Sequence, residues 1–135
     1  MSVIAIRAAL EAALKAITPA IDTGWENAPF TPTTGTPYQL VYLMPASPEN
    51  PTMGTGHYRF IGIFQINLFY PTQTGSGTAA ARAELIKAAF ARGNSFTKSG
   101  VTVKILYTPE IGQGRADDDR WMIPVKIRFS ADIFS

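Results

Sequence analysis

Residues 58–70, with the sequence YRFIGIFQINLFY, constrain the fold of this 135-residue chain more than any other segment. Side chains alternate along an extended strand, so one face consists of Phe60, Gly62, Phe64, Ile66, Leu68 and Tyr70. The other face is apolar at both ends and polar in the middle, and consists of Ile61, Ile63, Gln65, Asn67 and Phe69. A strand with apolar residues on both faces is covered on both, by its own domain or by a partner. The segment therefore predicts a buried strand with a second face that a subunit contact would cover.

Two segments have the periodicity of amphipathic helices. In residues 2–17 an apolar stripe recurs at steps of three and four, at Val3, Ile6, Leu10, Leu14 and Ile17. Residues 78–92 are rich in alanine, a strong helix former, and the predicted buried stripe is Leu85, Ile86, Ala89 and Phe90. Pro19 and Gly93 follow these segments and are expected to end the helices.

Three further segments predict strands. Residues 38–44 are a short run of β-forming residues, and residues 101–107 and 121–134 alternate between apolar and polar. In the second of them, Val101, Val103, Ile105 and Tyr107 are predicted to face the same way. Pro124 lacks a backbone donor, so the last strand is expected to be an edge or bulged at that point.

The order of these elements is helix, two strands, helix, two strands. It predicts an α+β fold: a two-layer sandwich in which a four-stranded, mainly antiparallel sheet carries both helices on one face. The length fits a single domain over residues 1–135. The opposite face of the sheet is then predicted to carry Gln65, Asn67, Lys104, Lys126 and Arg128.

Composition argues against an enzyme. The chain has one histidine and no cysteine, which excludes disulfides, thiolate zinc sites and cysteine nucleophiles. Only 16% of residues are charged, and the net charge of +2 is too weak to imply nucleic-acid binding by itself. No apolar stretch reaches the roughly 20 residues that a membrane span needs. We expect no cofactor, no metal, no membrane contact, and a function that lies in surfaces presented to other proteins.

The remaining polar clusters carry little chemistry. Asp117, Asp118 and Asp119 lack the spacing of a calcium loop, and with Arg115 and Arg120 beside them they predict a solvated loop tip. The same charges could steer a partner at the rim of a contact. His57 lies where a loop meets a strand, without the serine or aspartate order of a catalytic triad. A metal-dependent hydrolase using these groups is a third, weaker hypothesis.

Two other residue sets leave alternatives open. Trp25 and Phe30 lie in the long irregular stretch 19–37, where they either pack onto their own domain or anchor a neighbouring subunit. A basic set, predicted to share one sheet face, is either simply solvated or lies beside DNA; it consists of Lys104, Lys126 and Arg128. A second hypothesis for the whole chain is a small-ligand or peptide binding module. Its pocket would lie between helices and sheet and be lined by Trp25, Phe64 and Trp121.

Several segments together resemble the phage tail terminator proteins of the lambda type. WENAPFTPTTGTPYQLVYLMPA is similar to that family's E-N-x-P-F-x-P … P-Y opening. YRFIGIFQINLFYPTQTGSG resembles its strand followed by a glycine-rich turn into a helix, and AAFARG and IPVKIRFSA resemble its helix end and last strand. The resemblance covers nearly the whole chain in order.

This resemblance implies a small α+β subunit that assembles as a ring, typically a hexamer, on the end of a finished tail tube. The ring stops polymerisation and offers a surface for joining the head, while DNA passes through its central hole. The implied partners are other copies of the chain, the major tail tube protein and a head–tail joining protein. The implied location is the virion tail of a phage or prophage, assembled in the cytoplasm of the bacterial host. Completion proteins of the head–tail joint share this general shape and are the alternative.

On this interpretation the chain carries two kinds of site. The predicted subunit or partner interface consists of Trp25, Phe30, Met53, His57, Ile61, Ile63, Arg115, Asp117, Asp118 and Asp119. The predicted channel-facing residues are Lys104, Lys126 and Arg128. We also expect the loops 45–57 and 110–120 to reach axial or lateral partners, since loops on a rigid scaffold carry binding surfaces. A head-to-tail ring uses two different patches on each subunit.

Overall fold

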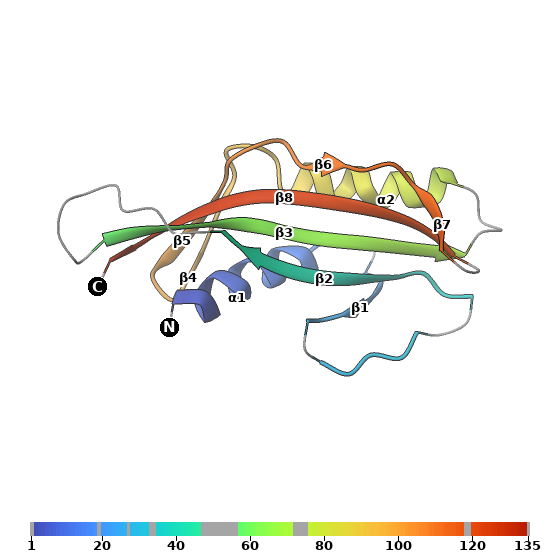
Figure 1. The fold of residues 1–135 in the computed structure, drawn as a ribbon, viewed down its shortest axis with the longest axis horizontal. Coiled ribbons are helices and arrows are strands. Elements are labelled where there is room, and N and C mark those ends of the chain that lie inside the picture. Colours follow the sequence, from blue (N-terminus) through green and yellow to red (C-terminus); the bar gives the residue numbers. More distant parts are fainter. Residues whose placement is uncertain are drawn as a thin grey trace.

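The structure is a computed structural model that describes residues 2–18, 20–26, 28–32, 35–46, 57–71, 76–117 and 120–134. These residues form two helices and eight strands (Figure 1). Their order is α1 (Ser2–Lys15), β1 (Asp22–Gly24), β2 (Tyr38–Pro45), β3 (His57–Pro71), α2 (Ser76–Ala89), β4 (Ser95–Lys98), β5 (Val101–Ile105), β6 (Glu110–Ile111), β7 (Arg115–Asp117) and β8 (Arg120–Phe134).

All eight strands belong to one mixed sheet with the order β1-β2-β3-β8-β5-β4, and β6 and β7 also pair with β8. β1 runs parallel to β2, and the other pairings are antiparallel. β3 and β8 pair along their whole length, from His57 opposite Phe134 to Pro71 opposite Arg120. We call this pair the central ribbon. The other edge of β8 is shared along its length by β7, β6 and β5.

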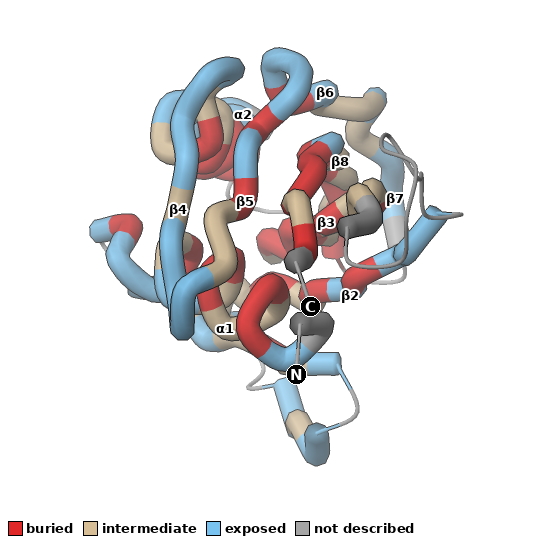
Figure 2. The backbone as a smooth tube through the Cα atoms, turned by 90° about the vertical axis from the view of Figure 1, so that its left-hand side faces the viewer, coloured by how far each residue is buried: buried red, intermediate tan, exposed pale blue. Residues whose placement is uncertain are grey.

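The predicted two-layer sandwich with a four-stranded, mainly antiparallel sheet is wrong. The sheet has eight strands, mixes parallel and antiparallel pairing, and curls into a half-barrel (Figure 2). The four strands that the sequence did not reveal are β1, β4, β6 and β7. Each has only two to four residues, too few to show the alternation that marks a strand.

Both helices bury their apolar stripes in one core with one face of the central ribbon. The predicted stripe of α1 is confirmed for Ile6, Leu10 and Leu14, all at most 1% exposed. The predicted stripe of α2 is partly wrong, because Leu85 is 42% exposed. Ile86 and Phe90 of that stripe are buried, Phe90 directly after the helix, and the buried side of α2 also includes Ala79, Arg82 and Ala83. Small alanines in this stripe let the helix approach the sheet closely.

Two local predictions change in the structure. β5 ends at Ile105, so Tyr107 does not continue the buried face and is 60% exposed. The stretch 110–120 is not one free loop, because β6 and β7 within it fold back along β8. Pro124 falls in the interval between the register pairs of β6 and β7, which stop at Val125 and resume at Met122. The missing donor of Pro124 therefore coincides with a gap in the register, although its carbonyl accepts a hydrogen bond from the Gly112 N–H at 2.8 Å on that edge.

Glu26 fastens the long segment after α1 to the rest of the domain. Its Oε1 accepts a hydrogen bond from the backbone N–H of Leu43 at 2.9 Å and pairs with Arg7 Nη1 at 3.0 Å. The bond from Leu43, together with the one from Arg7, lowers the pKa of the Glu26 carboxyl although partial burial opposes this. The pairing of β1 with β2 stops at Leu40, so Glu26 satisfies an edge donor that lies beyond it.

Candidate functional site

The face of the central ribbon turned away from the helices is the candidate site. It carries the odd-numbered residues of β3 and the even-numbered residues of β8, since Ile63 is opposite Arg128 and Gln65 is opposite Lys126. Register continues this face onto β2 and β5. We call it the open face, and it consists of Tyr42, Met44, Ile61, Ile63, Gln65, Asn67, Lys104, Lys126 and Arg128.

The open face is partly apolar and partly accessible. Tyr42 and Met44 are 36% and 40% exposed, and Ile61 and Ile63 are half-buried. In the middle of the face, Gln65 Nε2 donates a hydrogen bond to Asn67 Oδ1 at 2.9 Å. The predicted placement of Gln65, Asn67 and the basic set on one sheet face is confirmed by the register of β3, β5 and β8.

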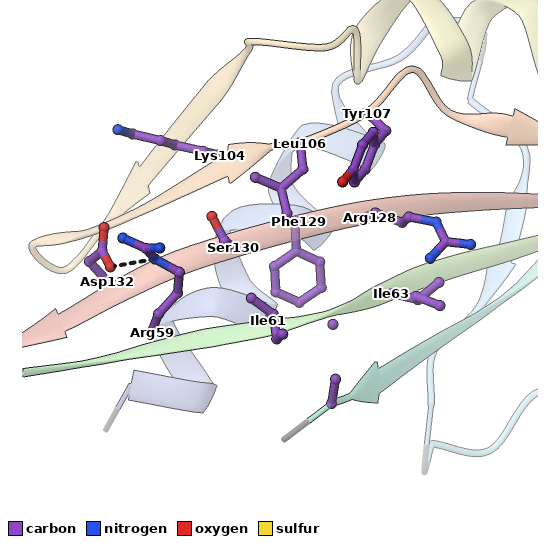
Figure 3. A pocket seen from close by; sticks show the side chains of 12 residues that line it. Arg59, Ile61, Ile63, Lys104, Leu106, Tyr107, Arg128, Phe129, Ser130 and Asp132 are labelled. Carbon is purple, nitrogen blue, oxygen red and sulfur yellow. Dashed lines mark hydrogen bonds and ion pairs between the residues drawn. The ribbon is translucent and has the colours of Figure 1, made fainter. Parts of the chain in front are cut away.

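One end of the open face contains a hollow with a volume of about 540 Å³ (Figure 3). This size is within the range of ordinary ligand pockets. Side chains from β3, β8 and the end of β5 surround it. We call it the hollow, and its lining includes Arg59, Ile61, Ile63, Lys104, Leu106, Tyr107, Arg128, Phe129, Ser130 and Asp132.

The hollow contains one ion pair and two further cationic side chains. Arg59 Nε pairs with Asp132 Oδ1 at 3.0 Å, directly across the two central strands. Neither Lys104 nor Arg128 forms an ion pair with any residue that the structure describes. The hollow therefore combines an apolar floor with two cations that are available to a partner.

The structure brings four predicted site residues together in the hollow: Ile61, Ile63, Lys104 and Arg128. The sequence had divided them between a subunit interface and a channel lining. Lys126 shares the open face but lies outside the lining, opposite Gln65 on one side and Glu110 on the other.

Sequence reasoning missed several residues of this hollow. Leu106 and Tyr107 were not expected there because the alternation of their strand predicted another orientation for Tyr107. The ion pair of Arg59 with Asp132 joins residues 73 positions apart, and it depends on a strand register that the sequence does not fix. The sequence did contain one signal for these residues: Leu106 and Tyr107 are two apolar residues directly after a strand and before the loop at 108–109.

Trp25 and Phe30 lie away from the hollow. Trp25 packs against the core, with Lys15 Nζ 5.0 Å from the centre of its ring. Phe30 contacts Tyr38 with ring centres 5.5 Å apart, and Tyr38 in turn stacks on Phe69 at 4.7 Å. Arg120 covers the ring of Tyr38 at 4.9 Å. These aromatic contacts lie at the end of the central ribbon that is remote from the hollow.

The pocket predicted between helices and sheet takes a different form. Trp25 lines a small cavity of about 330 Å³ together with Phe30, Tyr38 and Tyr42, and neither Phe64 nor Trp121 is part of its lining. Phe64 has no exposed surface and belongs to the core.

The remaining predicted residues are at strand ends or outside the described residues. β3 begins at His57, β7 begins at Arg115, and Asp117 ends β7 opposite Arg120. Met53, Asp118, Asp119 and the side chains of His57 and Asp117 lie outside what the structure describes. Among the described residues, no group of three or more His, Asp or Glu gathers as a metal site would require. Neither described helix is long and apolar enough to cross a membrane.

The structure defines a class of small domain with one curled sheet, of which one face packs on two helices and the other is partly apolar and partly accessible. The chain belongs to the phage tail terminator protein family, whose model matches residues 5–129. This confirms the family that the sequence motifs resembled. No curated protein matches the chain in sequence.

Two solved structures share the fold. One, whose title names no function, has a TM-score of 0.82 and 29% identity, over 100% of this chain and 99% of that one. The other is a chain titled as part of the virion of a native gene transfer agent particle, with a TM-score of 0.61 and 19% identity. That match covers 99% of this chain and 98% of the other. Family membership supports a structural, non-enzymatic role in a phage tail and a location in the virion tail.

Proposed function

We propose that this protein caps the finished tail tube as a ring of identical subunits, a hexamer, and thereby stops polymerisation of the tube protein. The ring also provides the surface to which the head joins, and DNA only passes through it. The observation that carries this proposal is the family match over residues 5–129, nearly the whole chain. Assembly in the cytoplasm of a bacterial host, from an active phage or a prophage, belongs to the same proposal.

The open face supports assembly into a ring. Monomeric proteins rarely leave large contiguous apolar patches uncovered, yet Tyr42 and Met44 are exposed beside the half-buried Ile61 and Ile63. Covering these side chains with another subunit removes apolar surface from water, which is the main driving force of association. We therefore assign Ile61 and Ile63 to the contact between subunits.

The other predicted contacts remain part of the proposal. Phe30 and Arg120 both contact Tyr38, at the end of the ribbon where Asp117 is opposite Arg120, so this end offers a second patch. A ring built head to tail needs two different patches on each subunit. Trp25, Arg115 and the loop 45–57, which contains Met53 and leads to His57, are proposed to reach axial or lateral partners.

The basic set is proposed to serve two purposes. Lys126 lies outside the hollow, and we assign it to the surface that faces the channel. Lys104 and Arg128 border an apolar floor, which favours contact with protein over exposure to a DNA channel. The channel assignment predicts that Lys126→Glu slows DNA passage while the ring still forms.

The proposed function is tested by a capping assay. Purified chain is mixed with self-assembling tail-tube protein from the same gene cluster, and tube lengths are measured by negative-stain electron microscopy. Shorter tubes with an added ring of density at one end are expected. Unchanged tubes at a large molar excess would contradict tube capping. They would direct attention to a completion protein of the head–tail joint, or to a binding module for a small ligand or peptide.

A further inference from the structure

We propose that the hollow receives the segment Asp117–Asp119 of a second copy of this chain, so that the acidic segment of one subunit docks into the basic hollow of the next. The inference rests on the proposed function, because it specifies how identical subunits join. It names the two patches that a head-to-tail ring requires.

Charge complementarity selects this occupant. Lys104 and Arg128 border the hollow and form no ion pair with any described residue. The run from Asp117 to Asp119 is the densest group of carboxylates in the sequence. Carboxylates bind guanidinium and ammonium groups through charge-assisted hydrogen bonds, which are stronger than neutral ones.

The dimensions of the sheet exclude contact within one chain. Asp117 is opposite Arg120 at one end of the central ribbon, whereas the hollow begins at Arg128. Eight residues of extended strand span roughly 27 Å, and Figure 1 shows β7 and β5 toward opposite ends of the sheet. From the position of Asp117, the acidic segment can therefore reach only the hollow of another copy.

The two parts of the contact contribute differently. Exposed ion pairs add little affinity each, but complementary charges orient the partners and speed their encounter. Tyr107 and Leu106, which line the hollow and are 60% and 38% exposed, offer apolar surface to the neighbouring subunit around the docked segment. The acidic segment thus sets the direction of assembly, and burial of this apolar surface strengthens the contact.

Cysteine cross-linking tests the contact directly, because the natural chain contains no cysteine. The variant carrying Asp118→Cys and Leu106→Cys is oxidised at assembly concentration, or on tail tubes, and run on a non-reducing gel. Each subunit offers one cysteine of each kind, so a ladder beyond the dimer is expected. The matched control pairs Asp118→Cys with Leu85→Cys, since Leu85 is similarly exposed but lies on α2. Equal cross-linking in both variants would overturn the inference.

Charge reversal provides a second test that does not depend on disulfides. One variant carries Lys104→Glu and Arg128→Glu, and the other carries lysine at Asp117, Asp118 and Asp119. Each variant alone is expected to self-associate about tenfold more weakly than the natural chain. An equimolar mixture is expected to recover association, because each hollow then finds a segment of opposite charge on the other variant. A mixture no better than the separate variants, all folded by circular dichroism, would contradict the contact.

The two proposals fail in different ways. A specific cross-linked ladder together with uncapped tubes would support the contact between subunits and contradict the capping function. Capped tubes whose subunits cross-link no better than the Leu85→Cys control would support the function and overturn the contact.

Discussion

The two faces of the central ribbon are made from alternate residues of the same strands, yet they have different surroundings. On one face Phe64 and Ile66 have no exposed surface and belong to the core that both helices share. On the other, Ile61 and Ile63 are only half-buried beside cations that have no described ion-pair partner. The comparison teaches that one strand can serve two purposes: its inner residues pack in the core, and its outer residues form the contact with a neighbour in the ring that we propose.

The strongest test of this division lies on the inner face. Phe64→Ala removes a fully buried ring that lies 6.1 Å from Phe90, centre to centre. Large-to-small substitutions of buried aromatics cost about 3–5 kcal/mol, because they lose transfer free energy and leave a cavity. Denaturant unfolding followed by circular dichroism measures the change. A loss below about 1 kcal/mol would show that this face is not the centre of stability.

A smaller effect is expected where the ribbon meets the end of β2. A Cβ added to Gly62 would lie 2.7 Å from the backbone oxygen of Met44 and 3.2 Å from Phe129 Cζ. Gly62→Ala is therefore expected to destabilise the subunit by about 1–3 kcal/mol, as overpacking does. The control is Gly77→Ala in α2, where a Cβ meets nothing within 4 Å. It should be neutral or stabilising by up to about 1 kcal/mol, and equal effects of both would refute the steric explanation.

On the outer face we expect the opposite balance of effects. Ile61→Thr with Ile63→Thr keeps β-branched residues in the strand but removes apolar surface from the open face. The free energy of unfolding of the isolated subunit should change by less than about 1 kcal/mol per site, while ring formation and tube capping are lost. Thermal unfolding and the tube-length assay measure the two properties on the same preparation. A destabilised subunit that still forms rings and caps tubes would show instead that Ile61 and Ile63 stabilise the subunit itself.

The smallest predicted effect concerns Glu26, which fastens the segment after α1. Its pKa is lowered in the folded state, so its contribution is present above the ordinary pKa of about 4.3 and lost as pH falls through the lower folded value. Burial raises the pKa of the nearby Glu11 and acts in the opposite direction. Glu26→Gln should therefore make the free energy of unfolding fall less steeply as the pH is lowered. The measurement is the free energy of unfolding between about pH 3 and 6, where carboxyl groups titrate. Parallel curves for the variant and the natural chain would contradict this role of Glu26.

Long, patterned segments made much of the fold predictable. Both helices and the four longer strands lie where the periodicity placed them. The two faces of β3 were also separated correctly, because alternation along so long a strand determines which residues point inward. The four short strands had no such pattern. β4 alone had a local signal, since Ser99 and Gly100, both with positive φ, form its turn into β5.

The candidate site was predictable in its residues but not in its grouping. Ile61, Ile63, Lys104 and Arg128 were all singled out from patterns within their own strands. That they share one hollow depends on how β5, β8 and β3 align, and this register arises from packing between segments far apart in the chain. Family motifs identified the protein class independently of these contacts.

The most direct test of the division between the two faces is electron cryomicroscopy of tail-tube ends bearing the bound protein. The account predicts that a neighbouring subunit covers Ile61 and Ile63, while the helices pack only within their own subunit. A ring in which the open face is exposed to solvent and neighbours meet through α1 and α2 would contradict it.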